Sequence, residues 1–110
     1  SFGAIEALRS GETGPDMNPP PANFAALAER VAAAVAGLQA VTEAEIAALE
    51  GGDVVFRFGE RAMPFTAQDY VLSFAMPNFY FHASMAYAVL RNQGLAVGKM
   101  DWLGKVRMKG

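Results

Sequence analysis

The sequence predicts a mainly α-helical protein with one small β-hairpin before a last long helix. Two observations predict the helices: an apolar stripe of helical period within residues 23–50, and an apolar run with almost no charge between Asp69 and Arg91. A third predicts the hairpin, because the hydrophobic pattern changes from helical to alternating after Gly52. A chain of 110 residues forms one domain at most.

Residues 1–10 are expected to be helical, because apolar side chains recur every three positions and Gly11 is suited to end a helix. Nothing precedes Ser1 to cap this helix, so we expect an element that begins earlier and a chain that is a fragment or a processed product. Residues 11–22 contain a proline run that excludes a helix or a central strand. They are predicted to form an ordered crossover or a linker.

Residues 23–50 are predicted to form a long helix capped by Asn23, followed by a short one. The apolar stripe of the long helix consists of Phe24, Leu27, Val31, Val35, Leu38 and Val41. Its other side is mostly alanine with Gly37, and such small residues allow a second helix to approach closely. Thr42 and Glu45 have the spacing of a capping box that starts the short helix.

Residues 53–65 are predicted to form the hairpin. Glycine at the first position of the Gly59-Glu60 turn suits a type II′ turn. Pro64 restricts the second strand to the edge of a sheet. A single hairpin is not stable alone, so we expect it to lie on the helices.

Residues 66–93 are predicted to form one long helix that Thr66 caps. Pro77 lies inside it and is expected to kink or split the helix at Met76. The tail, residues 94–110, mixes a few apolar side chains with basic ones and is expected to stay solvated at its end.

The composition predicts a partner. Hydrophobic residues make up 53% of the chain and charged residues 18%, and a small domain cannot hide that much apolar area alone. We therefore expect a homodimer. A net charge of −2 with mixed signs provides no footprint for nucleic acid. The absence of cysteine excludes disulfides, thiolate nucleophiles and cysteine-type zinc sites, and fits a cytoplasmic protein.

Residues 70–90 are long and apolar enough to be considered as a membrane span. Pro77, Asn78 and His82 interrupt the run, and no basic cluster sets an orientation. We therefore expect a buried helix and no membrane contact. The chain also lacks the glycine-rich phosphate-binding motifs, the H-E-x-x-H motif and the G-x-S-x-G motif.

Two segments carry a resemblance to a known family: GAIEALRSG, and FTAQDYVLSFAMPNFYFHASMAYAVLRNQGLAVGKMDWLG. They closely resemble an uncharacterised bacterial family, domain of unknown function nineteen-ninety-three, whose members look like distant relatives of the DinB/YfiT superfamily of four-helix bundles. The resemblance implies an incomplete bundle that lacks the first helix and most of the second. Residues 1–10 would end the second helix, residues 23–50 would hold the third, and residues 66–93 would be the fourth.

The resemblance also implies a site. Many DinB-like proteins bind a divalent metal such as zinc, nickel or iron through three histidines, of which two lie on the fourth helix as H-x-x-x-H. That pair falls on Asn78 and His82, so this chain has N-x-x-x-H. His82, the only histidine, is either a metal ligand or general base, or a buried histidine hydrogen-bonded to a neighbour. Asn78 is either a weak ligand or substrate-orienting amide, or it satisfies backbone groups freed by Pro77.

Two functions remain open. The first is a binding or structural module without catalysis, with Tyr80, Met85 and Tyr87 as a candidate pocket for an unidentified small molecule. The second, implied by the resemblance, is a divalent-metal-dependent enzyme that uses His82, such as a thiol-dependent transferase. The sequence identifies no catalytic group and no definite cofactor. Its aromatic side chains are more typical of core and subunit-interface packing than of a ligand site.

Overall fold

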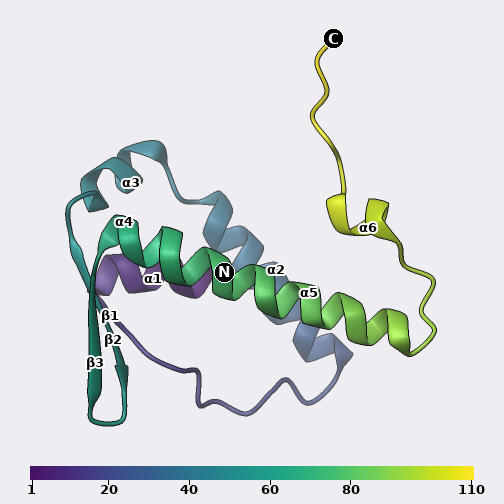
Figure 1. The fold of residues 1–110 in the computed structure, drawn as a ribbon, viewed down its shortest axis with the longest axis horizontal. Coiled ribbons are helices and arrows are strands. Elements are labelled where there is room, and N and C mark those ends of the chain that lie inside the picture. The colour runs from purple at the N-terminus through teal and green to yellow at the C-terminus, as the bar shows by residue number, and fades with distance from the viewer. The chain divides into compact units, whose positions relative to one another are not determined.

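The chain is mostly helical with one small sheet (Figure 1). The computed structural model describes residues 1–110, which divide into two compact units, Ser1–Met76 and Pro77–Gly110. The first unit contains the sheet and the buried core. The second contains most of the last long helix and the C-terminal segment.

The first unit begins with α1 (Phe2–Ser10). Gly11 ends this helix in the left-handed conformation, with φ of 77°, and its N–H donates to the carbonyl of Ala7 at 2.8 Å. Ala7 is 1% exposed and is the one fully buried residue of α1. The helix therefore turns Ala7 into the core, with Ala4 and Leu8 packed beside it.

The second helix, α2 (Phe24–Gln39), starts where its cap predicts, because the side chain of Asn23 accepts from the N–H of Ala26 at 2.8 Å. Its small side faces α1. A Cβ added at Gly37 would lie 2.8 Å from the ring of Phe2, which is closer than real side chains approach. A side chain at this position would force the Phe2 ring to shift, so Gly37 allows α1 and α2 to pack as closely as they do.

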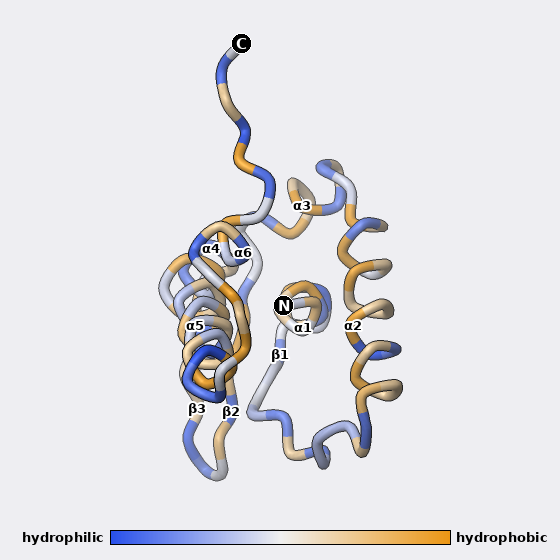
Figure 2. The backbone as a smooth tube through the Cα atoms, turned by 90° about the vertical axis from the view of Figure 1, so that its right-hand side faces the viewer, coloured by the Kyte–Doolittle hydropathy of each residue, from blue (hydrophilic) through white to orange (hydrophobic).

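The apolar stripe of α2 points elsewhere, and Figure 2 shows the hydrophobic positions along this helix. None of the residues of α2 is buried. The exposed large side chains of the stripe are Phe24, Leu27, Val31, Val35 and Leu38. The small side of α2 therefore packs on α1, and its large apolar side stays open within this unit.

The short helix α3 (Glu43–Leu49) is capped by Thr42, whose hydroxyl accepts from the N–H of Glu45 at 3.1 Å. Only this half of the expected capping box forms. The Glu45 carboxylate instead binds the guanidinium of Arg9 on α1, at 2.5 Å and 3.2 Å. One ion pair therefore ties α3 to α1.

The sheet has three strands, β1 (Glu12–Thr13), β2 (Asp53–Phe58) and β3 (Arg61–Thr66), in that order. β2 and β3 pair antiparallel through the Gly59-Glu60 turn, and β1 runs parallel to β2. The expectation of a lone hairpin is therefore incomplete. The pairing of β1 was not predictable locally, because two residues carry no periodic pattern.

The turn and the edge follow from the sequence. Gly59 has φ of 59° and no residue other than glycine has a positive φ, which fits a type II′ turn. Pro64 lies on β3, an edge strand, opposite Val55.

The segment before α2 is held by Asp16, which accepts from the N–H of Asn18 at 2.9 Å and from Arg30 at 2.6 Å, as in an ordered crossover.

The core of the first unit lies between the sheet, α1 and the segment after β3. Val54 is fully buried at its centre, together with Ala7 and Tyr70. The rings of Tyr70, Phe65 and Phe74 contact one another with centroids 5.8–5.9 Å apart. Burial raises the pKa of the Tyr70 phenol, and a hydrogen bond with Thr13 acts in the opposite direction.

The chain becomes helical again after β3. Thr66 caps α4 (Ala67–Asp69), which continues as a π-helical segment, Tyr70–Ala75. The N–H of Met76 donates to the carbonyl of Val71, five residues earlier, immediately before Pro77. The helix changes type at Met76, where a kink or split was expected: this residue keeps α-helical dihedral angles, and the wider turn before it accommodates the proline.

The second unit contains α6 (Lys99–Leu103) and, from Pro77 onward, α5 (Met76–Asn92). The rings of Tyr87 on α5 and Trp102 on α6 meet at 5.9 Å. The Gly98 N–H donates to the Asp101 carboxylate at 2.7 Å and starts α6. This helix was missed in the predicted tail, because one turn is too short to show a period.

No single helix of the chain is long and apolar enough to cross a membrane. α2 and α3 reach that composition only when they are taken together, and an 83° bend separates them.

Candidate functional site

His82 and Asn78, the metal-site candidates, lie one turn apart on α5 and therefore on the same side of it. Both side chains are exposed. The His82 ring meets the neighbouring Phe81 edge-on, with centroids 5.2 Å apart. The expectation of a buried histidine is therefore not met.

These two side chains do not fit a divalent metal centre by themselves. A catalytic zinc site usually has three protein ligands, and here one imidazole and one amide are present. No three histidine or acidic side chains of the chain lie where they could hold an ion together. Asn78 and His82 therefore provide at most two of the ligands that such a site needs.

We expect the tag-free chain to retain far less than one equivalent of zinc, nickel or iron after exposure to each and removal of the excess. Two donors on one helix leave most of a coordination shell to water. Plasma mass spectrometry measures the metal content, and His82→Ala is the matched variant, expected to behave like the unchanged chain. Stoichiometric metal that disappears in His82→Ala would contradict this prediction.

The three residues of the candidate aromatic pocket do not come together. Tyr87 contacts Trp102 and accepts a hydrogen bond from Arg91 at 3.0 Å. It lines a small cavity of about 240 Å³ in the second unit. Tyr80 and Met85 lie outside that lining and are 53% and 51% exposed.

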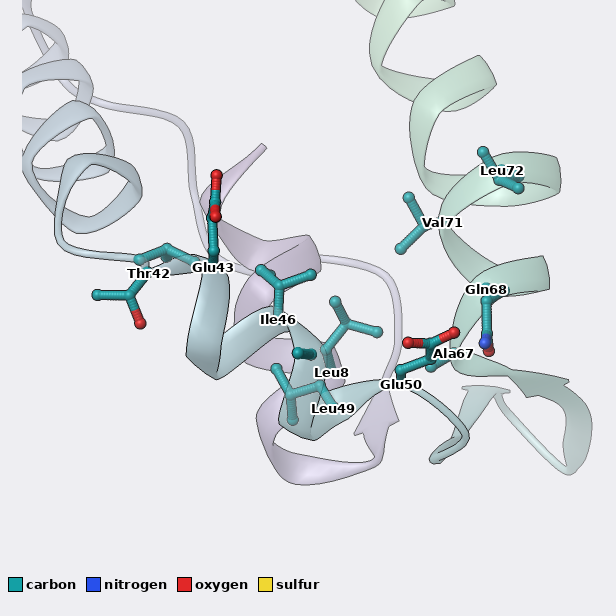
Figure 3. Close-up of a pocket in the computed structure, with 12 residues that line it drawn as sticks. Leu8, Thr42, Glu43, Ile46, Leu49, Glu50, Ala67, Gln68, Val71 and Leu72 are labelled. Carbon is teal, nitrogen blue, oxygen red and sulfur yellow. The ribbon is translucent and has the colours of Figure 1, made fainter.

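A larger cavity, of about 670 Å³, lies in the first unit (Figure 3). Ile46 and Leu49 reach it from α3, Leu8 from α1, and Val71 and Leu72 from the π-helical segment. The volume is within the range of small-molecule sites, which are mostly apolar and carry a few polar groups.

The polar groups of this cavity are acidic or neutral. Glu43 and Glu50 are its only charged residues, and Thr42 and Gln68 are its uncharged polar ones. In Figure 3, Glu50 is drawn on the side of Gln68, and Glu43 lies beside Thr42. Neither glutamate belongs to an ion pair of the structure, since the pairs join Arg9 to Glu45 and two other couples away from the cavity.

The ion pair of Arg9 with Glu45 sets the wall that α3 contributes. The Arg9 guanidinium holds the pKa of the Glu45 carboxyl below its ordinary value through hydrogen bonds and charge. The charge of Glu45 is thereby compensated by Arg9, whereas Glu43 and Glu50 belong to no ion pair. Sequence reasoning missed this cavity, because its walls come from α1, α3, α4 and the π-helical segment, and each wall alone looks like an ordinary apolar face.

The comparison with known families identifies the chain. The model of the family "Domain of unknown function (DUF1993)" matches residues 3–103. The chain belongs to the DUF1993 family.

A solved structure is similar to this DUF1993 chain: that of a DinB family member protein from Shewanella denitrificans, with 28% sequence identity and a TM-score of 0.69. The match covers 87% of this chain and 53% of the other, so the chain spans about half the length of that relative. Family and structure together confirm the predicted DUF1993 and DinB-like assignment. A search of curated proteins gave no match.

Proposed function

We propose that this DUF1993 chain is a homodimeric binding module of the four-helix-bundle type, which works by association rather than by its own catalysis. The observation that carries the proposal is the open apolar stripe of α2. Its five side chains within α2, from Phe24 to Leu38, are between 37% and 89% exposed, although they have the spacing of a helix that packs against another helix.

The stripe cannot be covered by α1. Val31, in the stripe, and Gly37, which touches Phe2, differ by six positions, or about 120° around the helix axis. α1 lies on the Gly37 side, so a separate helix must cover the Val31 side. Large apolar areas left open in this way are typical of interaction surfaces.

A second copy suits this surface. The stripe advances by three and four residues, from Phe24 to Leu27 to Val31, which is the spacing of paired helices. Most soluble oligomers are symmetric, so the stripe would meet the same stripe across a two-fold axis. Complete burial of a valine or leucine side chain contributes about 1.5–3 kcal/mol, so several together can hold two copies.

Light scattering after size-exclusion chromatography at low micromolar concentration tests the dimer. We expect a mass of twice 11.7 kDa for the unchanged chain. The variant Val31→Glu/Val35→Glu is expected to have the single mass, because paired stripes would bury four unpaired carboxylates.

The matched control is Ala32→Glu/Ala36→Glu, which adds the same charge to exposed positions on another side of α2. It is expected to keep the double mass. A single mass for the unchanged chain, or equal dissociation of both variants, would overturn the proposal.

A further inference from the structure

We propose that the 670 Å³ cavity of the first unit binds an amphiphilic cation, with an alkyl or aryl body and an ammonium head. The site belongs to residues of one copy. It therefore goes beyond the proposed dimer and does not depend on it.

The aliphatic walls of the cavity suit the alkyl or aryl body of the ligand. Six branched aliphatic side chains line the cavity: Leu8, Val41, Ile46, Leu49, Val71 and Leu72. Of these, Ile46 and Leu72 are 43% and 66% exposed. A ligand that covers them removes apolar area from water, which is the main favourable contribution to binding in such sites.

The acidic side chains of the lining favour a cationic head on the ligand. All the formal charge of the lining is negative, from Glu43 and Glu50, and no lysine, arginine or histidine lines the cavity. Arg9, on α1, is already engaged with Glu45 at 2.5 Å. An ammonium group at this lining gains a partner, whereas a carboxylate or sulfate head would be repelled.

The polar groups also provide hydrogen-bond acceptors for an ammonium. The carboxylate oxygens of Glu50 and the amide oxygen of Gln68 belong to the same part of the lining in Figure 3. An ammonium has donors and no acceptor, so it matches carboxylates and amide oxygens better than a neutral alcohol does. These contacts set the preference for an ammonium over an anionic head group, and the aliphatic walls supply most of the affinity.

Isothermal titration calorimetry tests the proposal with two probes of equal chain length, dodecylammonium and dodecyl sulfate, both below their micelle concentrations. We expect one dodecylammonium per copy, bound at least about tenfold more tightly than dodecyl sulfate, where a factor of ten corresponds to about 1.4 kcal/mol. In Glu43→Gln/Glu50→Gln the preference is expected to vanish while weak binding of both probes remains. In Ile46→Trp, which fills the cavity, both probes are expected to lose binding.

Two controls separate this site from other effects. Glu60→Gln removes a charge at the Gly59-Glu60 turn, outside the cavity, and is expected to keep the preference. The monomer-forming variant Val31→Glu/Val35→Glu is expected to bind dodecylammonium as the unchanged chain does, so a failed dimer and a failed cavity give different results. Equal affinity for both probes, no binding at all, or a preference that survives in Glu43→Gln/Glu50→Gln would overturn the proposal.

Discussion

Val54→Asp is expected to destabilise the first unit by more than about 4 kcal/mol, which is enough to unfold a small domain. Val54 is fully buried, and its neighbours in the core are Ala7 and Tyr70. None of these offers a cation to a buried carboxylate, so the charge would have to be solvated by opening the core. Circular dichroism during urea titration measures the loss as a missing or much earlier transition.

Val55→Asp is the matched control. Val55 is the next residue of β2 and therefore points to the opposite face of the sheet, where it is only half-buried. Aspartate is unfavourable in a β-strand by about 1 kcal/mol, and this cost is common to both variants. The difference between them isolates burial, and equal destabilisation would show that Val54 is not the centre of the core.

Gly37→Ala is expected to destabilise the chain by about 1–3 kcal/mol, although alanine is the better helix former by about 1 kcal/mol. The new methyl group would lie 2.8 Å from the Phe2 ring, so the ring or the helix that carries it must shift. Gly3→Ala is the matched control, since Gly3 lies in α1 with nothing within 4 Å of the added Cβ. It is expected to stabilise the chain by about 0.5–1 kcal/mol.

The sign of the Gly37→Ala effect should reverse when Phe2 is also replaced by alanine. Without the ring, only the gain in helix preference remains, so Phe2→Ala/Gly37→Ala is expected to be more stable than Phe2→Ala alone. This double-mutant cycle reports the contact directly. If Gly37→Ala destabilised the unchanged chain and Phe2→Ala by the same amount, the contact of Gly37 with Phe2 would not be the cause of the loss.

The sequence predicted those elements whose signals are local. Asn23 and Thr42 mark helix starts through their own side chains. Gly59 and Pro64 mark the turn and the edge strand, because backbone geometry alone restricts them. The family assignment followed from extended stretches of sequence and agrees with the family model.

The candidate site was predicted less well. His82 stood out as the one imidazole in an apolar run, but the structure exposes it and adds no further donor beside Asn78. The cavity of the first unit gave no signal in the sequence. Leu8, Ile46 and Val71 are each unremarkable apolar residues, and only their convergence makes a site.

The sequence by itself determined where the helices and the hairpin lie and which helix faces are apolar, because periodicity, caps and turns depend on neighbours along the chain. Only the tertiary structure decided which face of α2 packs on α1, that β1 joins the sheet, and that α3 closes a cavity. The reason is that these features depend on contacts between distant residues, such as Gly37 with Phe2 and Glu45 with Arg9, which no local pattern encodes.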